Sequence, residues 1–339
     1  MIKISTVIVT RNRKESLYKT LQALNNQTCK LQEVIIVDSS DVELNEAELS
    51  STFDKLNIKY ITSVPSVCVQ RNIGICKSTS DYIFICDDDV EPESGYVSAL
   101  SDYIESNSST TAVSGLILQT DENGNWMSQF PPKSPVNLLF SLIFQLSVWG
   151  EVDDKVQKSL WIKPVIRFYK KRGNGFSFAG WPIITDFSDP VFETNIYGLG
   201  ASIVKKEWLI NNPFDEVLDQ YGIGDNYGIC ISFPVKIKVL TNLSVFHHRV
   251  TENRLDSSTA YYRRVLALHY FLKKSNKFNY INTFWLLWSL TGNIILFLKK
   301  RQYRSFRAAL KSMLTIVAFN NPYWKASKKN TKIVCPELN

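Results

Sequence analysis

Short apolar runs alternate with segments of helical periodicity along the first hundred residues. The apolar runs predict strands at residues 3–10, 33–38, 58–61 and 82–86. Leu17, Leu21 and Leu24 recur at helical spacing, and further helices are predicted at residues 42–56 and 67–79. Strands that alternate with helices predict βαβ units and a mainly parallel sheet with helices on both faces. In such sheets ligands bind beyond the carboxyl ends of the strands.

The second half of the chain has a less regular pattern. No clean period runs through residues 125–189, where the apolar segments 136–149 and 159–169 stand out. We expect the first to be a buried or lipid-facing helix and the second to be a strand or loop beside a cleft. Residues 194–210 predict a turn of small residues followed by an amphipathic segment. Residues 235–249 predict two strands that end at His247 and His248.

Positive charge is concentrated at the C-terminal end. Residues 1–248 carry 22 Lys and Arg against 29 Asp and Glu, whereas residues 249–339 carry 17 against 3. The apolar run 280–298 lies among these charges and is near spanning length, but Asn282, Gly292 and Asn293 interrupt it. Helices that lie in the membrane interface are therefore expected, and Trp285 and Trp288 suit that depth.

An anionic membrane surface is the partner that this basic, apolar tail predicts. The alternative is a helical subdomain whose basic face is merely solvated. No recognised nucleic-acid motif accompanies the charge, so no nucleic-acid partner is expected. The run Val7–Val9 is too short for a signal peptide, and the six cysteines show no CxxC spacing. These features predict a cytoplasmic protein with free thiols, peripheral at the inner face of the cell membrane.

The run Tyr82–Cys86 leads directly into three carboxylates, Asp87, Asp88 and Asp89. On an extended segment Asp87 and Asp89 leave the same face, while Asp88 points away. Two carboxylates at this spacing can hold one hard cation, Mg²⁺ or Mn²⁺, that keeps open positions for phosphate oxygens. A Ca²⁺ loop is excluded because Pro92 occupies the position that requires glycine. Taken alone, the stretch could equally be a solvated acidic turn.

Polar residues follow the other strand ends and the third helix. Asp38 could accept a hydrogen bond from a nucleobase or ribose, or be a helix N-cap. Arg71 and Asn72 could reach a pyrophosphate or orient the acidic residues. Arg11, Asn12 and Arg13 follow the first strand and would lie over the same crevice.

These segments, in this order, resemble the family 2 inverting glycosyltransferases, which have the GT-A fold. The nucleotide-sugar half is matched by STVIVTRNR, VIIVDSSD, VQRNIGI and YIFICDDDVEP. The second half is similar in GLGAS, FDE, GIGDNYG and SVFHHR, and in the basic segment AYYRRVLALHYFLKK. The resemblance covers roughly residues 3–275. It implies a nucleotide-sugar half at residues 1–115, an acceptor half of the same domain at 116–250, and a basic, apolar helical tail at 251–339.

The resemblance also implies roles for individual residues. Asp87 and Asp89 would hold the divalent metal on the donor pyrophosphate, and His247 or His248 could complete the coordination. Asp225 would be the general base that deprotonates an acceptor hydroxyl. Gly200 and Ala201 would lie on the acceptor side. The residues expected to bind the donor, UDP-linked or dTDP-linked, are Thr10, Arg11, Asn12, Asp38, Arg71, Asn72, Asp87 and Asp88.

The function so implied is metal-dependent transfer of a sugar to a hydroxyl of a lipid-linked or glycan acceptor, as in surface polysaccharide synthesis. Two features depart from the family pattern. Gly224 and Asn226 flank Asp225 where an adjacent carboxylate pair is usual, and ICISF replaces an expected arginine. The alternative is therefore an inactive, membrane-bound homologue that binds a nucleotide sugar. A receiver domain would need a lysine that AVSGLIL lacks, and a pyrophosphorylase would need an N-terminal Gly-rich loop.

Overall fold

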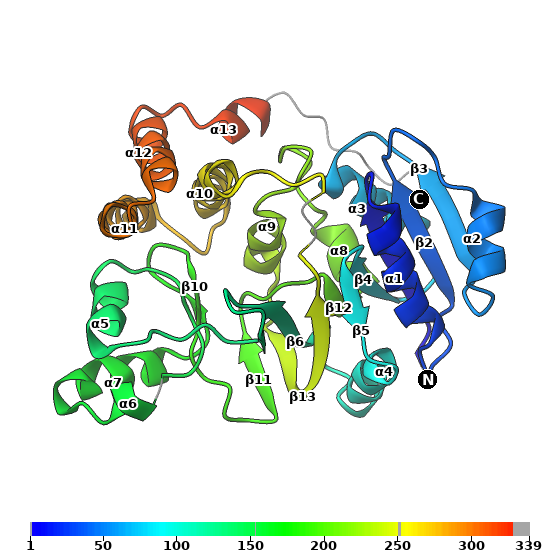
Figure 1. The fold of residues 1–339 in the computed structure, drawn as a ribbon, viewed down its shortest axis with the longest axis horizontal. Helices are drawn as coiled ribbons and strands as arrows, with labels where there is room; N and C mark the ends of the chain where they lie inside the picture. Colours follow the sequence, from blue (N-terminus) through cyan, green and yellow to red (C-terminus); the bar gives the residue numbers. More distant parts are fainter. Residues whose placement is uncertain (1, 153, 250–251, 328–339) are drawn as a thin grey trace.

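The computed structural model describes residues 2–152, 154–249 and 252–327, in which helices flank a central sheet (Figure 1). The strands are β1 Ile4–Thr10, β2 Glu33–Asp38, β3 Ile58–Thr62, β4 Tyr82–Asp87, β5 Val90–Pro92, β6 Ala112–Thr120, β7 Trp126–Met127, β8 Val148–Trp149, β9 Gly175–Phe176, β10 Pro182–Ile184, β11 Val191–Thr194, β12 Ala201–Lys205 and β13 Ile237–His247. The helices are α1 Lys14–Asn25, α2 Glu46–Thr52, α3 Val67–Lys77, α4 Tyr96–Ser106, α5 Pro135–Ile143, α6 Asp154–Gln157, the 3₁₀ helix η1 Leu160–Ile162, α7 Lys163–Arg172, α8 Lys206–Asn211, α9 Asp225–Ser232, α10 Ser257–Lys274, α11 Tyr280–Lys299, α12 Tyr303–Val317 and α13 Pro322–Ser327.

The central sheet has the order β11-β13-β6-β12-β4-β1-β2-β3, with β5 paired to β13 and β7 to β6. Strands β4, β1, β2 and β3 run parallel, as predicted, and β12 is antiparallel to both of its neighbours. Val9 of β1 faces Asp87 of β4, and Thr10 faces Asp38 of β2. The three strands therefore deliver their polar ends to one edge of the sheet.

Alternate residues of β1 enter different apolar cores. Val7 packs in a cluster with Ile75 of α3, whereas Ile8 packs in a cluster with Leu17 and Leu21 of α1. Since neighbouring side chains of a strand point to opposite faces, helices cover both faces of this sheet. Helix α2 is much shorter than predicted. It begins after its N-cap Asn45, whose side chain accepts hydrogen bonds from two backbone N–H groups. The helix therefore occupies residues 46–52 within the predicted range 42–56.

The region between β7 and β11 contains a small three-stranded sheet of order β8-β10-β9, with α5, α6, η1 and α7 around it. The helix expected at residues 136–149 is confirmed only in its first part, as α5, because the chain leaves the helix after Ile143 and then forms β8. The expected strand or loop at 159–169 is wrong, because this segment forms η1 and most of α7. Pro164 stands in the first turn of α7, and Val165 and Tyr169, one turn apart, are both buried.

Strand β13 also corrects the sequence interpretation. Residues 237–247 form one strand rather than two, with a shift of register between Leu240 and Ser244. The bulge lets a single strand pair with β6 along its length and then with β5 near its end. Four cysteines are free thiols as expected, namely Cys29, Cys68, Cys86 and Cys230. The expectation of a free thiol does not hold for Cys76, and Cys335 lies outside the described residues.

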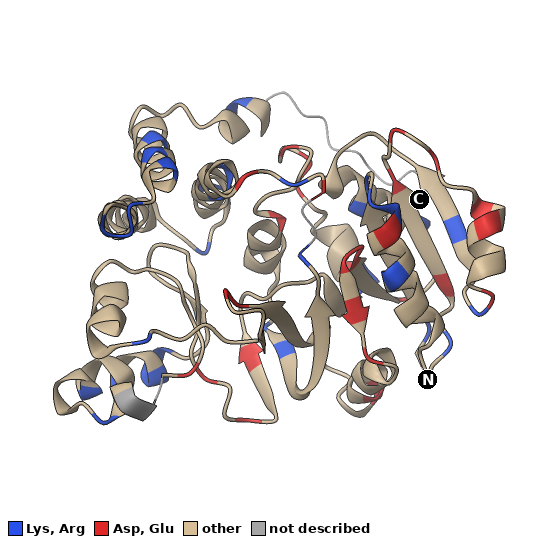
Figure 2. Ribbon diagram, in the orientation of Figure 1, with Lys and Arg blue, Asp and Glu red and all other residues tan. Residues whose placement is uncertain are grey.

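Helices α10 to α13 pack beside the sheet domain, and Lys and Arg are spread over them (Figure 2). Helix α10 contacts α9, and α11 and α12 pack on α10. Leu286 and Leu290 of α11 are fully buried in the same core as Trp181 and Tyr227. By length and composition α11 could cross a membrane, with a mean hydropathy of 1.5, but one face of it is covered by the protein.

Candidate active site

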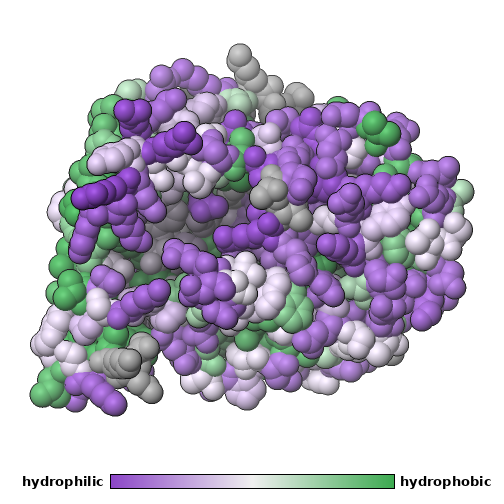
Figure 3. Space-filling model, in the orientation of Figure 1, coloured by the Kyte–Doolittle hydropathy of each residue, from purple (hydrophilic) through white to green (hydrophobic). Residues whose placement is uncertain are grey.

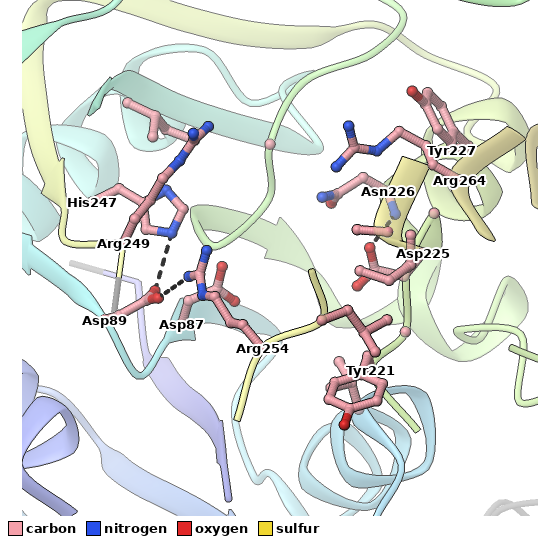
Figure 4. Close-up of a pocket in the computed structure, with 18 of the residues that line it drawn as sticks. Asp87, Asp89, Tyr221, Asp225, Asn226, Tyr227, His247, Arg249, Arg254 and Arg264 are labelled. Carbon is pink, nitrogen blue, oxygen red and sulfur yellow. Dashed lines mark hydrogen bonds and ion pairs between the residues drawn. The ribbon is translucent and has the colours of Figure 1, made fainter. Parts of the chain in front are cut away.

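A cavity of about 730 Å³ lies at the carboxyl ends of β1 and β4. Its walls come from these strand ends, from β13, from the start of α9 and from the lobe built on β8 and β10. Figure 4 shows Asp87, Asp89, His247 and Arg254 on one side of the space and Asp225, Asn226 and Arg264 on the other. Its six arginines are Arg11, Arg13, Arg71, Arg249, Arg254 and Arg264. Such a lining suits a ligand that carries several negative charges.

The middle carboxylate of the acidic turn faces inward. Asp88 is 4% exposed and accepts hydrogen bonds from Thr10 Oγ1 at 2.7 Å and Arg13 Nη1 at 3.0 Å. Ser16 Oγ donates to the backbone oxygen of Asp88 at 2.8 Å. Burial raises the pKa of Asp88 to about 6, against the opposing charge of Arg13. These hydrogen bonds hold the acidic turn against β1 and α1. The side-chain oxygens of Asp88 and Thr10, which were expected to bind a donor, are therefore already bonded within the protein.

Asp87, Asp89 and His247 form a cluster that fits a divalent cation. One ligand atom from each lies within 4.8 Å of the others. The pairing of β5 with β13 brings His247 opposite Val90, and the backbone N–H of His248 donates to Asp89 O at 2.8 Å. Two carboxylates and an imidazole form a donor set that suits Mn²⁺ and, through oxygen, Mg²⁺. The residues expected to hold the metal are therefore brought together.

The structure distinguishes between the two histidines. His247 Nε2 lies 3.1 Å from Asp89 Oδ1, and His247 Nδ1 lies 3.2 Å from Gln119 Nε2. The ring of His248 points to the other face of the strand, where its Nε2 lies 2.8 Å from Glu91 Oε2. Because neighbouring side chains of a strand alternate in direction, only His247 can join the carboxylates.

Cations surround Asp89 in addition to the histidine. Arg254 Nη2 lies 2.5 Å and Arg13 Nη1 lies 3.9 Å from Asp89 Oδ2. Burial alone would raise the pKa of Asp89, but His247, Arg254 and Arg13 outweigh burial and lower it. Asp89 is therefore ionised and able to accept a cation. Sequence reasoning missed Arg254, since nothing in the local sequence shows that the segment after β13 turns back over the acidic residues.

Arg71 joins the acidic turn to the predicted base. Its guanidinium pairs with Asp225 Oδ2 and lies 2.7 Å from Asp87 Oδ1, and its side chain is only 8% exposed. A buried guanidinium between two carboxylates fixes both in place. The sequence interpretation allowed Arg71 either to contact phosphate or to orient the acidic residues, and the geometry shows the second arrangement.

Asp225 is the first residue of α9 and lines the cavity. Gly224 precedes it with a φ of 100°, and a Cβ at this position would lie 2.5 Å from Ala267 Cβ of α10. Glycine is therefore required for the turn into α9. Burial raises the pKa of Asp225 above its ordinary value, opposed by the charge of Arg71. A carboxylate whose pKa is raised binds a proton more readily, as general-base chemistry requires.

Arg264 reaches the cavity from α10, across from the acidic turn (Figure 4). The sequence interpretation noted a missing arginine after Asp225 and did not assign its place to another residue. Arg264 belongs to the YYRR segment, which the family resemblance assigns only to a basic tail. Its arrival at the cavity depends on the packing of α10 against α9, which brings distant segments together.

Three residues expected to bind a donor are engaged elsewhere and do not line this cavity. Asn12 bonds to Ser40 and Asp41, and the buried Asp38 accepts from Ser40 and from Tyr60 Oη. Asn72 donates to Phe214 O and Glu216 Oε1, both at 2.9 Å. These contacts tie neighbouring loops to the sheet domain. Arg11 does line the cavity, where it donates to Gln220.

Gly200 and Ala201, expected on the acceptor side, lie behind the acidic turn instead. The backbone oxygen of Gly200 accepts from Asp87 N at 2.8 Å, and Ala201 is fully buried in β12. The nearby residues that do face the cavity are Ile196, Tyr197 and Gly198. Trp149 and Trp181 add broad apolar surfaces to the same wall.

Comparison with protein families matches residues 5–148 to glycosyl transferase family 2. The uncharacterised glycosyltransferase YwdF of Bacillus subtilis (strain 168) is 28% identical over 125 residues, which cover 36% of this chain and 46% of that protein. Chondroitin synthase of Escherichia coli is 28% identical over 155 residues, covering 44% and 22% of the two chains. The match thus spans less than half the length of either relative.

Similar folds occur among solved structures. A structure of GalNAc-T7 with UDP, GalNAc and Mn²⁺ has a TM-score of 0.54 at 14% identity, covering 86% of this chain and 55% of that one. Residues 1–349 of S. aureus TarS give 0.52 at 11% identity, covering 97% and 91%. The same TarS fragment in complex with UDP gives 0.50 at 15% identity, covering 85% and 71%. These similarities confirm the GT-A type of fold.

Proposed function

We propose that the chain is a glycosyltransferase that transfers a sugar from a nucleoside diphosphate with inversion, because residues 5–148 match glycosyl transferase family 2. One observation carries this proposal: the cluster of Asp87, Asp89 and His247 shares a cavity with Asp225. A family 2 transferase needs a place for a charged pyrophosphate next to a base for the acceptor, and this cavity offers both kinds of group.

The acidic cluster would hold Mg²⁺ or Mn²⁺, with Asp87, Asp89 and His247 as ligands. When bound, such an ion neutralises charge on the departing nucleoside diphosphate. The arginines of the cavity add positive charge around the same oxygens, and Arg11, Arg249 and Arg254 are the candidates that can reach them. A divalent ion accompanies UDP in the similar fold of GalNAc-T7, and UDP occupies that of TarS, so UDP or dTDP is our preferred donor nucleotide.

Asp225 would act as the general base. It takes the proton of an acceptor hydroxyl as that oxygen attacks the anomeric carbon from the face opposite the leaving group. Arg71 keeps the carboxylate in position and leaves its pKa above the ordinary value. A single displacement of this kind inverts the anomeric centre and needs no covalent nucleophile.

The acceptor would enter along the wall that contains Trp149, Trp181 and Tyr197. We propose a lipid-linked or glycan acceptor, as in surface polysaccharide synthesis.

The chain would lie at the cytoplasmic face of the cell membrane through its C-terminal helices. Residues 257–327 contain 12 Lys and Arg and no Asp or Glu, which suits an anionic lipid surface. Since one face of α11 packs on the protein, we propose that α11 lies on the membrane rather than spans it.

The first test is a thermal-shift and calorimetry screen of UDP, dTDP, GDP and CDP, each with and without Mn²⁺ or Mg²⁺. We expect one nucleotide to stabilise the wild type only with metal, since ligands that bind the native state raise its stability. Asp89→Asn should abolish this effect. Glu91→Gln is the matched control, because Glu91 is an exposed carboxylate of β5 that pairs with His248 outside the cavity. Binding that is independent of metal, or unaffected by Asp89→Asn, would contradict the proposal.

The second candidate function is a nucleotide-sugar-binding scaffold without turnover. It is favoured by the single carboxylate at Asp225, which Arg71 already pairs. If Asp225 is the base, Asp225→Asn should bind the nucleotide as the wild type does and lower kcat by about 10²-fold or more. The turnover of each protein is measured as release of the nucleoside diphosphate from the donor when purified lipid-linked acceptors are present. Equal turnover by the variant would remove Asp225 from catalysis, and a wild type that binds donor without any turnover would establish the scaffold.

A further inference from the structure

The exposed surface of the C-terminal helices carries apolar residues in two stripes. Ile281, Phe284, Trp288, Ile295 and Leu298 are exposed on one side of α11, at spacings that keep them within about one third of the helix circumference. On α12 the exposed apolar residues are Tyr303, Leu310, Leu314 and Val317, again along one side. The opposite face of α12 is buried against the protein, so the exposed stripe of α12 is the face that does not pack on other helices.

A second exposed apolar site lies far away in the sequence, on η1. Leu160 is 74% exposed and Trp161 is 55% exposed, so two large apolar side chains lie next to each other at the surface. They stand in the segment 155–172, which has seven Lys and Arg and no Asp or Glu. Lys158, Lys163 and Lys170 in this segment are exposed. The segment therefore combines apolar and cationic groups in the same way as the C-terminal helices.

Contacts in the structure connect η1 and α7 to α11. Arg172 at the end of α7 stacks over the ring of Phe178 at 4.2 Å, and Phe178 lies 5.8 Å from the ring of Trp285 on α11. Trp288 of α11 donates to Ile143 O at the end of α5, at 2.8 Å. Figure 1 places α12, α11, α5 and α7 along one edge of the molecule, and Figure 3 shows hydrophobic residues along that edge.

We infer that η1 and α7 form a second membrane-binding element, which contacts an anionic phospholipid surface together with α11 and α12. This inference rests on the proposed membrane location of the C-terminal helices. Charge complementarity selects the partner, because acidic residues are absent from both segments while their exposed apolar side chains can enter the lipid interface. A basic stretch with Trp and Leu at its surface is typical of a peripheral membrane contact.

A second membrane contact would fix the position of the cavity relative to the membrane. The lobe that bears η1 and α7 also supplies Trp149 and Trp181 to the cavity wall. Contact at two separated elements fixes the orientation of the molecule on the membrane, whereas contact through the C-terminal helices alone would leave it free to tilt. The lobe would thus keep the acceptor side of the cavity at a constant height above the lipid.

Vesicle co-sedimentation of the full chain tests the inference, with vesicles of phosphatidylcholine alone and of phosphatidylcholine mixed with phosphatidylglycerol. The apolar variant is Leu160→Ser/Trp161→Ser and the charge variant is Lys163→Gln/Lys170→Gln/Lys171→Gln. We expect each to lower the partition onto phosphatidylglycerol vesicles about tenfold or more. Binding of the wild type should weaken in high salt and on neutral vesicles.

Matched controls come from the opposite half of the molecule. Val42→Ser/Val64→Ser removes two exposed valines, 79% and 64% exposed, and Lys19→Gln/Lys30→Gln/Lys55→Gln removes three exposed lysines. We expect wild-type partition for both controls. All variants should keep the thermal midpoint of the wild type and its metal-dependent nucleotide shift, because the changed side chains are exposed and outside the cavity.

Two different results would overturn the inference. In the first, Leu314→Ser/Val317→Ser on α12 loses vesicle binding while both η1–α7 variants bind as the wild type. This result would show that η1 and α7 do not bind the membrane, and it would support membrane contact through the C-terminal helices. If the wild type binds no vesicles, the proposed membrane location fails as well. In that case, dimerisation in sedimentation equilibrium that Leu160→Ser/Trp161→Ser abolishes would identify a second copy of the chain as the partner.

Discussion

Gly200 shows how closely the acidic turn is fitted to its neighbours. A Cβ at this position would lie 2.0 Å from Asp87 Oδ2, a distance at which one of the two groups must move. Asp87 N also donates to Gly200 O, so the backbone of the two residues is already fixed. The carboxylate of Asp87 is therefore the group that would be displaced, and the cluster with Asp89 and His247 would open.

We expect Gly200→Ala to weaken metal-dependent nucleotide binding by about tenfold or more, since Asp87, a proposed ligand of the metal, would be misplaced. Titration calorimetry with Mn²⁺ and the nucleotide measures the change. Gly95→Ala is the control, because no heavy atom lies within 4 Å of a Cβ there and the φ of Gly95 is negative. Unchanged affinity in Gly200→Ala would show that Asp87 does not contribute to the metal site.

At the scale of elements, α10 and the start of α13 are joined through a buried histidine. His269 of α10 is 3% exposed, and its Nδ1 lies 3.0 Å from Asn321 Nδ2, which also donates to Leu266 O. Burial lowers the pKa of His269 to about 4, and the charge of Lys273 adds to the shift. The folded protein therefore holds this imidazole neutral, whereas the unfolded chain protonates it near its ordinary pKa of about 6.5.

We expect this difference to reduce stability as the pH falls from about 6.5 to about 4, because the unfolded chain binds the proton more readily there. The free energy of unfolding should fall by about 2 kcal/mol more in the wild type than in His269→Gln between pH 7 and pH 4.5. Urea unfolding at the two pH values measures this, with His248→Gln as an exposed control. Parallel curves for wild type and His269→Gln would show that His269 is not held neutral.

At the scale of the whole molecule, the C-terminal helices share a core with the sheet domain. Leu290 of α11 is fully buried, and the neighbouring Ser289 accepts a hydrogen bond from Trp181 Nε1 at 2.9 Å. Gly292 lets α11 approach Phe144 closely, since a Cβ at this position would lie 2.5 Å from Phe144 Cβ. Trp181 lines the cavity, so the position of α11 is connected to the cavity wall.

We expect Leu290→Ala to lower the free energy of unfolding by about 2–4 kcal/mol in the absence of vesicles, through loss of apolar burial and creation of a cavity. Leu298→Ala is the matched control on the same helix, because Leu298 is 47% exposed and should change stability by less than about 0.5 kcal/mol. Equal effects of the two substitutions on denaturant unfolding would mean that α11 does not pack on the domain in solution.

Local sequence carried much of the information about the fold. The alternation of apolar runs with helical periodicity predicted β1 to β4 and the helices between them, since each pattern reflects which faces are buried. The segment 159–169 was missed, because Val165 and Tyr169 become a buried helical face only once the lobe around them has formed. The carboxyl ends of β1, β2 and β4 also lie at one edge of the sheet, as expected for parallel strands, although Asp38 at the end of β2 does not line the cavity.

The sequence by itself therefore determined the resemblance to glycosyl transferase family 2, the type of fold and the acidic turn after β4 as a candidate metal site. Only the tertiary structure decided which polar groups meet there. His247 rather than His248 joins Asp89 because of the pairing of β13 with β5, while Arg254 and Arg264 arrive through segments distant in sequence. Asn12, Asp38 and Asn72 are drawn into other contacts. The physical reason is that periodicity encodes burial of a local segment, whereas contacts between side chains depend on how distant segments pack.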